Sequence, residues 1–434
     1  MIKKVLLFTI LILGALMGNT LPKYYTKTLK NGLEVVAIPI NKGSNVITTD
    51  IYYKVGSGDE VMGKSGIAHM LEHMNFKSTK HLKAGEFDKI VKGYGGVNNA
   101  STGFDYTHYF IKSSSKNLGK SLKLFAELMA NLSLKDDEFQ TERKVVLEER
   151  YWRTDNSPMG YLYFRLFNNA YLYNSYHWTP IGFIDDIKNW SINDIRAFHK
   201  MYYQPKNAVV IVAGDVKPNE LFQESEKYFG KIKNSGKIQR SHQVEPPQDG
   251  EKNIIVHKKT EVEMVALAYH IPDFKNKDQV ALSAIGELLS RGKSSRLVKN
   301  LVDKKRLANQ IFAYNMENRY PGLFIIIAVC NPGVKGEIVK KEILKELGKI
   351  KEGKVTKKEL EKIKTNTKAD FIYSLESSSS VANLYGSYLA RGDIEPLLDY
   401  EKNINTLTLE TIKSVANKYF DTKNLTSIIL KDEK

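Results

Sequence analysis

The sequence contains the stretch SINDIRAFHKMYYQPKNAVVIVAGD at residues 191–215 and, 217 residues later, the similar stretch TLETIKSVANKYFDTKNLTSIILKD at residues 408–432. Each stretch predicts a helix capped by Ser or Thr, then an aromatic pair, a turn ending in Lys-Asn, and an apolar strand rich in β-branched residues. The two stretches align without a gap. We therefore predict two tandem copies of one α+β fold.

The rest of the chain divides around this repeat. At 434 residues the chain is too long for one ordinary domain. Residues 236–252 are polar and contain Pro246, Pro247 and Gly250, which is typical of an exposed linker. We predict an N-terminal domain at residues 22–235 and a homologous C-terminal domain at residues 253–434.

Each half is predicted to be a mainly antiparallel sheet with helices packed on it. Strand-like runs at residues 33–38, 46–55 and 107–112 alternate with long helical stretches such as residues 118–132. A sheet needs another layer to bury its apolar face, and the helical stretches supply that layer.

The first 20 residues have the order of a secretory signal peptide. Lys3 and Lys4 precede an uncharged apolar run at residues 5–17, and small or polar residues follow. About 13 apolar residues are too few to span a bilayer, which favours a cleaved signal over an uncleaved anchor. No other stretch approaches the ~18 apolar residues of a membrane span. The mature chain is therefore expected to be secreted, and periplasmic in a bacterium with two membranes.

The formal net charge of +16 does not by itself indicate a nucleic-acid partner. The Lys residues are spread along the chain and often stand beside Glu or Asp, as at residues 340–346, which is typical of solvated helix faces. The single cysteine, Cys330, lies in an apolar run and is expected to be a core residue. One thiol excludes an internal disulfide and a metal site built from thiolates.

A short motif, HMLEH at residues 69–73, has the spacing of a metal site. On a helix, His69 and His73 lie about 40° apart and Glu72 lies about 60° to the other side, so one face carries two imidazoles and a carboxylate. Two His at i and i+4 can hold one zinc ion, and the Glu is then placed to take a proton from water. This is the H-x-x-E-H order of the inverzincins. Surface His and Glu residues on a helix are the alternative interpretation.

A catalytic zinc usually has three protein ligands, and residues 142–149, ERKVVLEE, offer the third. Glu142 and Glu149 are seven residues apart and share a helix face with Val145 and Val146, whereas Glu148 points about 100° away from Glu149. Carboxylates on an apolar face are costly to bury unless a positive group meets them. A zinc ion would be such a group, and a Lys partner is the alternative.

Four ordered motifs resemble those of one protease family. They are HMLEHMNFKST at residues 69–79, GGVNNAST at 95–102, ERKVVLEE at 142–149 and YYQPKNAVVIVAGDV at 202–216. Over essentially the whole mature chain the sequence resembles the pitrilysin and mitochondrial processing peptidase family, in its short bacterial form. The resemblance implies zinc held by His69, His73 and Glu149, base catalysis by Glu72, and a supporting role behind the ligands for Glu142. It also implies that the strand around Asn99 and Ala100 pairs with an extended polypeptide substrate.

The sequence departs from the family pattern in its second half. Active relatives resemble one another in an Arg and a Tyr, seven residues apart, that reach the scissile peptide. Residues 294–309, SSRLVKNLVDKKRLAN, align with that stretch and place Val302 and Asn309 at the two positions. The resemblance therefore implies half a site, completed by a homologous partner subunit in a heterodimer. A weakly active homodimer is the alternative, and so is a non-catalytic assembly subunit, although subunits of that kind commonly lose the zinc residues.

Overall fold

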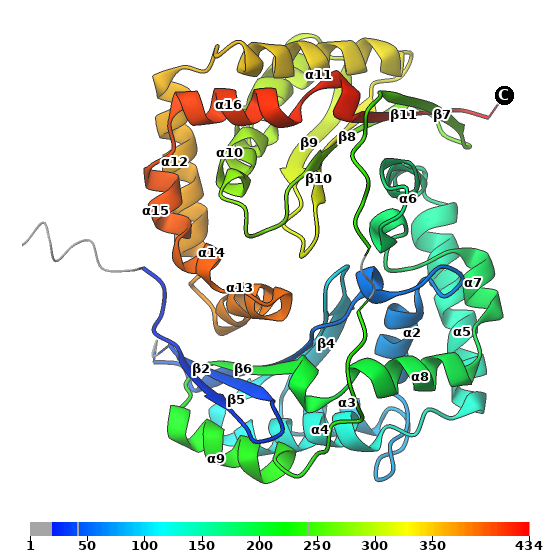
Figure 1. Cartoon of the computed structure of the whole chain (residues 1–434), viewed down its shortest axis with the longest axis vertical. Coiled ribbons are helices and arrows are strands. Elements are labelled where there is room, and N and C mark those ends of the chain that lie inside the picture. The colour runs from blue at the N-terminus through cyan, green and yellow to red at the C-terminus, as the bar shows by residue number, and fades with distance from the viewer. Residues whose placement is uncertain (1–19, 41–42, 241–242, 434) are drawn as a thin grey trace, which may run out of the picture.

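The computed structural model of the chain describes residues 20–40, 43–240 and 243–433, and its strands form two sheets (Figure 1). The strands of the first half are β1 (Tyr25–Thr28), β2 (Glu34–Pro39), β3 (Val46–Tyr53), β4 (Val97–Thr102), β5 (Thr107–Ser114) and β6 (Ala208–Gly214). Those of the second half are β7 (Lys252–His257), β8 (Met264–Ile271), β9 (Ala308–Asn315), β10 (Gly322–Cys330) and β11 (Leu425–Lys431). The expected signal segment, apart from Thr20, lies outside the described residues.

The two sheets have corresponding strand orders, β1-β2-β6-β3-β5-β4 and β7-β11-β8-β10-β9. In each sheet the strand from the repeat, β6 or β11, pairs in parallel with the first strand of the common order and antiparallel with the next. The remaining pairs are antiparallel. The predicted α+β class with two mainly antiparallel sheets is therefore confirmed, and β1 is an extra strand of the first half.

The helices of the first half are α2 (Ile67–Met74), α3 (Glu86–Gly93), α4 (Leu118–Asn131), α5 (Asp136–Arg150), α6 (Pro158–Ala170), α7 (Ile184–Asn189), α8 (Ile192–Tyr202) and α9 (Pro218–Phe229). Those of the second half are α10 (Asp278–Ser290), α11 (Gly336–Lys351), α12 (Lys357–Tyr373), α13 (Ser378–Arg391), α14 (Glu395–Leu398), α15 (Tyr400–Asn405) and α16 (Leu409–Tyr419). The repeat helices α8 and α16 begin at the expected caps. Ser191 and Thr408 accept hydrogen bonds from the backbone three residues on, at 3.2 and 3.1 Å.

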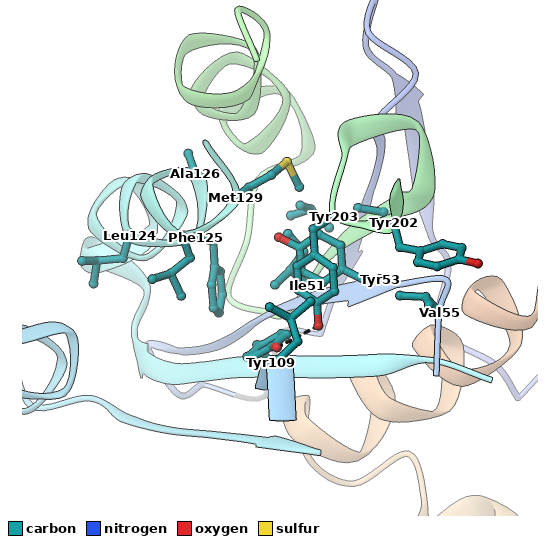
Figure 2. Packing of buried hydrophobic residues seen from close by; sticks show 14 of the residues in the cluster. Ile51, Tyr53, Val55, Tyr109, Leu124, Phe125, Ala126, Met129, Tyr202 and Tyr203 are labelled. Carbon is teal, nitrogen blue, oxygen red and sulfur yellow. Dashed lines mark hydrogen bonds between the residues drawn. The ribbon is translucent and has the colours of Figure 1, made fainter. Parts of the chain in front are cut away.

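The first sheet buries one face against helices of its own half, where aromatic side chains fill much of the core (Figure 2). Tyr53 of β3 stacks on Tyr203 with 4.0 Å between ring centroids, and the hydroxyls of Tyr109 and Tyr203 lie 3.0 Å apart. Phe125 and Met129 of α4 pack into the same cluster. The paired hydroxyls satisfy each other, so these large rings can be buried without leaving a polar atom unbonded.

The opposite face of each sheet is covered by a helix from the other half. Helix α13, from the second half, packs on β3 and β6 of the first sheet, and Tyr52 donates a hydrogen bond to Asn383 at 3.2 Å. Helix α6, from the first half, packs on β8 and β11 of the second sheet. In Figure 1 the orange α13 accordingly lies against the lower sheet. This exchange buries apolar surface between the halves and ties them together.

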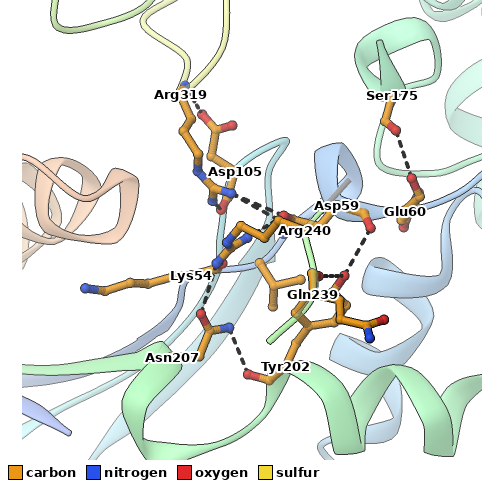
Figure 3. A network of polar contacts seen from close by, with 12 residues as sticks. Lys54, Asp59, Glu60, Asp105, Ser175, Tyr202, Asn207, Gln239, Arg240 and Arg319 are labelled. Atoms are coloured by element: carbon orange, nitrogen blue, oxygen red, sulfur yellow. Dashed lines mark hydrogen bonds and ion pairs between the residues drawn. The ribbon is translucent and has the colours of Figure 1, made fainter. Parts of the chain in front are cut away.

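A polar network also joins the halves close to the linker (Figure 3). Arg319, between β9 and β10, reaches into the first half, where its guanidinium lies 3.2 Å from the Asp59 carboxylate and donates to the backbone oxygen of Asp105. Arg240 of the linker pairs with the same Asp59 and donates to Asn207 at 2.9 Å. Arg240, within the predicted linker, is therefore bound to the first half. The domain limits at 22–235 and 253–434 stay a prediction, since α6 and α13 each serve the opposite sheet.

We expect an Arg319→Met substitution to lower the free energy of unfolding by about 3 kcal/mol, because Asp59 and Asp105 are buried and would lose a cationic partner. Urea denaturation monitored by circular dichroism measures the change. The matched control is Arg291→Met, because that side chain is 61% exposed although it also pairs with an acid. The control should cost less than about 1 kcal/mol. Equal stability of the two variants would contradict the role given to Arg319.

Two smaller expectations concern membranes and the cysteine. Within residues 20–40, 43–240 and 243–433, no helix has both the length and the apolar character needed to cross a bilayer. Cys330 ends the fully buried strand β10 and is itself buried, as expected of a core residue.

Candidate metal centre

Helix α2 carries His69, Glu72 and His73, and its first turn is held in place from several sides. Gly66, at its start, has φ +84°, and a Cβ there would lie 2.6 Å from the Ile181 carbonyl oxygen. The buried Glu60 carboxylate accepts hydrogen bonds from the N–H groups of Gly66 and Ala68, each at 2.8 Å, and from the Trp178 indole at 2.7 Å. A carboxylate at a helix N-terminus satisfies amides that the helix leaves unbonded. Glu60 therefore fixes the helix one residue before His69.

The three expected ligands converge on one point. The Nε2 atoms of His69 and His73 lie 3.6 and 3.4 Å from Oε2 of Glu149, and the three donor atoms all lie within 4.8 Å of one another. A tetrahedral zinc with bonds of about 2.0–2.1 Å separates its ligand atoms by about 3.4 Å. Two imidazole nitrogens and one carboxylate oxygen, with a fourth position left for water, form the donor set of many catalytic zinc sites. Among the described residues, no other group has such spacing.

Glu142 lies behind the ligand His73, on the side of the ring that faces away from the three donor atoms. Its Oε1 lies 2.9 Å from Nδ1 of His73, and its Oε2 pairs with Lys77. A carboxylate that accepts from Nδ1 leaves Nε2 of the same ring free to bind a metal. The sequence prediction that Glu142 and Glu149 share one face of a helix is confirmed by α5. Val146 is buried on that helix, but Val145, expected on the same apolar face, is 47% exposed because it faces a cleft.

The protonation behaviour of the site follows from burial and from these carboxylates. Burial, with help from the neighbouring His73, lowers the pKa of His69 to about 4. Burial also opposes the charged form of His73, but hydrogen bonds with Glu142 and Glu149 outweigh it and raise the pKa of His73 to about 9. Burial opposes the charged forms of Glu149 and Glu142, but the bond to His73 together with the neighbouring cations, Arg153 for Glu149 and Lys77 for Glu142, lowers the pKa of each carboxyl. The acids thus stay ionised beside the imidazoles.

Glu72 faces the same cleft and is held by strand β4. Its Oε2 accepts a hydrogen bond of 2.5 Å from the Thr102 hydroxyl, and burial raises the pKa of the Glu72 carboxyl. The cleft has a volume of about 1220 Å³ and is lined by the three converging donors, Glu72, and residues 98–102 of β4. The Thr102 hydroxyl thus holds one oxygen of the Glu72 carboxylate.

Strand β4 is the edge of the first sheet, so among the described residues no strand pairs with one side of its backbone. Exposed and partly buried side chains alternate along it, with Asn99 exposed and Ala100 partly buried. The Ala100 N–H donates to the side-chain oxygen of its neighbour Asn99 at 2.9 Å. An edge strand of this kind is a template for a further strand. Asn99 and Ala100 line the same cleft as the metal donors.

Sequence reasoning missed four residues of the site. They are Glu60 under α2, Lys77 on Glu142, Thr102 on Glu72, and Arg153, whose guanidinium lies 2.7 Å from Oε1 of Glu149. Two had a local signal, because Lys77 and Arg153 each stand four residues after a ligand and can share its helix face. Thr102 ends the motif GGVNNAST, so its position was marked without its role.

Val302 and Asn309, which stand where the family pattern has Arg and Tyr, are not among the residues that line the cleft. Val302 is in the π-helical turn η6 (Val298–Lys304) and packs partly buried against the second core, and Asn309 is exposed on β9. Neither Arg296 nor Arg306 lines the cleft. Arg296 is engaged by Glu359 in two hydrogen bonds of 2.8 Å. Among the described residues we therefore find no substitute for the Arg in this stretch.

Comparisons with known proteins agree with the two-half organisation. Residues 35–174 match the family model described as Insulinase (Peptidase family M16), and residues 189–367 match the model described as Peptidase M16 inactive domain. The zinc protease PqqE of Helicobacter pylori is 56% identical over 424 residues, covering 96% of both chains. A probable mitochondrial-processing peptidase subunit beta of Arabidopsis thaliana is 24% identical over 421 residues, covering 93% of this chain and 77% of that one.

A solved structure extends the comparison to three dimensions. The crystal structure of a protease from Helicobacter pylori superposes with a TM-score of 0.93 at 56% identity, covering 95% of this chain and all of the other. The resemblance to the pitrilysin and mitochondrial processing peptidase family, drawn from four motifs, is thereby confirmed. From the two family models and a relative similar over nearly its whole length, the chain belongs to peptidase family M16.

Proposed function

We propose that the chain is a zinc-dependent peptidase that cleaves extended or unfolded polypeptides. The observation that carries this proposal is the convergence of His69, His73 and Glu149, with Glu72 beside them, in a cleft bordered by an open sheet edge. The zinc expected from the sequence is confirmed at the level of the family, whose curated relatives include proteins named zinc proteases. The donor set of two imidazole nitrogens and one carboxylate oxygen suits that metal.

We assign the residues as follows. His69, His73 and Glu149 hold the zinc, and Glu142 orients His73 through Nδ1. When bound, the zinc polarises the peptide carbonyl and makes a water molecule more acidic. Glu72, fixed by Thr102 on one oxygen, takes the proton from that water on the other oxygen and passes it to the leaving amine.

The substrate lies along β4 as an added strand. Backbone groups on the open side of an edge strand bind any extended peptide, so this mode selects unfolded chains over folded proteins and leaves specificity to the side-chain pockets. Asn99 and Ala100 contribute the central part of that edge. Thr102, at the end of the same strand, is bonded to Glu72, so the strand that aligns the peptide also aligns the base.

A partner subunit completes the site. Val302 and Asn309 occupy the positions where active relatives resemble one another in an Arg and a Tyr, and neither lines the cleft. A chain that keeps every metal ligand but lacks the donors for the carbonyl oxygen fits the zinc-bearing subunit of a heterodimer of homologous chains. A weakly active homodimer is the alternative that the same test separates.

We expect the isolated chain to hydrolyse unfolded peptides at least about 100-fold more slowly than a mixture with a homologous partner that carries the Arg and Tyr. One donor to the oxyanion is typically worth about 10²–10³ in rate. The measurement compares the chain alone, the partner alone and both mixed. If the isolated chain is as fast as the mixture, no partner is needed. If all three samples are inactive with zinc bound, the non-catalytic assembly role is favoured instead.

The chain is also proposed to act outside the cytoplasm, in the periplasm of a bacterium with two membranes. The support is the order of charged, apolar and small residues in its first 20 positions. N-terminal sequencing of the protein recovered from the periplasmic fraction tests this directly, and a mature chain that begins near residue 20 is the expected result.

A further inference from the structure

Trp152 differs from the other two tryptophans of the chain. It is 73% exposed, whereas Trp178 and Trp190 are each 2% exposed. It lies in η3 (Tyr151–Asp155), a π-helical turn that continues α5 and begins two residues after the proposed ligand Glu149. Single exposed apolar side chains are common on protein surfaces. This one lines the cleft that holds the metal donors.

The turn that presents Trp152 is rigidly held. Arg150, at its start, is buried, and its guanidinium binds both carboxylate oxygens of Asp155 at 2.9 and 3.2 Å and the Gly182 carbonyl. The same guanidinium lies 3.9 Å from the centre of the Phe164 ring. Gly160 of α6 approaches the turn so closely that a Cβ there would clash with the Arg153 carbonyl. Irregular helical turns of this kind are frequent at functional sites.

Trp152 is one of several apolar side chains that line the cleft, and on its own turn the Arg153 guanidinium lies 6.0 Å from the centre of the Trp152 ring. Val145, one turn before Glu149 on α5, is also exposed to the cleft, and Tyr163, Phe164 and Ile181 line it as well. Trp152 follows Glu149 by three residues, which is about 4.5 Å along a helix, and consecutive residues of an extended peptide are about 3.3 Å apart. An indole at this place can reach a side chain one or two residues from the bond that Glu72 acts on.

We infer that Trp152 is a specificity-determining residue that packs against an apolar or aromatic side chain of the bound polypeptide, close to the cleaved bond. This inference rests on the proposed peptidase function and adds a substrate preference to it. A rigid aromatic on a fixed backbone loses little conformational entropy on binding, which is why Trp is enriched among the residues that dominate interfaces. The open edge of β4 accepts any extended backbone, and the apolar side chains of the cleft, Trp152 among them, select among substrate side chains.

The first test is fluorescence, since Trp152 is the one tryptophan of the chain that solvent can reach. The sample is the full mature chain with zinc and Glu72→Gln, which leaves the peptide uncut. The probes are two short unstructured peptides that are identical except for Phe or Ser at the residues around the cleaved bond. The Phe peptide should shift the emission to shorter wavelength and protect it from acrylamide. An unchanged emission and unchanged quenching at saturating Phe peptide would overturn the contact.

The second test uses Trp152→Ala and the conservative Trp152→Phe, with binding of labelled peptides measured by fluorescence anisotropy. Trp152→Ala should weaken binding of the Phe peptide about 10-fold and binding of the Ser peptide less than about twofold. The substitution removes an aromatic pair and buried apolar area that only the Phe peptide can form. Trp152→Phe should restore most of the difference. The matched control is Tyr173→Ala, an aromatic residue 63% exposed and not among the residues that line the cleft. Equal losses for both peptides, or an equal loss in the control, would contradict the inference.

Hydrolysis assays separate this inference from the proposed function. If the Phe peptide binds through Trp152 but the zinc-loaded protein, with or without a partner, cuts neither peptide, the peptidase function fails and the contact stands. If both peptides are cut at the same rate by the wild-type protein and by Trp152→Ala, the function stands and the contact fails. The expected result is a preference for the Phe peptide in kcat/KM that falls about 10-fold in Trp152→Ala.

Discussion

A Glu72→Gln variant should keep about one zinc ion per chain and lose peptide hydrolysis by a factor of about 10² or more, because general base catalysis typically contributes about 10²–10⁴. The amide has the shape of the carboxylate, and its carbonyl can still accept the hydrogen bond from Thr102. It cannot take a proton from water. Initial rates on an unfolded peptide, with any required partner present, measure the loss.

The matched control for this variant is Glu148→Gln. Glu148 also lines the cleft and is exposed, but it is not one of the converging donors. The control should therefore retain most of the activity. Retained turnover in Glu72→Gln, or an equal loss in both variants, would rule out Glu72 as the base.

The double variant His69→Ala with Glu149→Ala should lose both zinc and hydrolysis. Two of three protein ligands are removed, and the remaining His73 cannot by itself hold a metal in competition with water and buffer. Activity should fall to the background of the assay and should not return when zinc is added. Unfolding by urea is the control for the structure, because Glu149 and His69 line the cleft rather than the apolar core and their loss should not abolish the fold.

The metal helix could be predicted because its signals are local. His69, Glu72 and His73 lie within five residues, so helical geometry alone places them on one face. Periodicity likewise selected Glu142 and Glu149 over Glu148 on α5. The choice of Glu149 as the ligand came from the family resemblance, since spacing alone does not say which of two carboxylates meets the metal and which meets His73 from behind.

The features that could not be predicted depend on contacts between distant segments. An apolar stripe on α6 or α13 indicates that the helix is buried, but it does not say which sheet covers it, and both helices pack on the sheet of the other half. Glu60 reaches α2 from outside the helix, and Thr102 meets Glu72 across thirty positions of sequence. Periodicity predicts that Val145 is a core residue. In the structure it is exposed, because that side of α5 borders the cleft.

The zinc content of purified mature protein tests the central claim most directly. The account predicts about one zinc per chain in the wild-type protein and in Glu72→Gln, and close to none in the His69→Ala, Glu149→Ala double variant. Elemental analysis after removal of loosely bound metal gives these three values from the same preparation. Full zinc occupancy in the double variant, with its fold intact, would contradict the assignment of His69, His73 and Glu149 as the site.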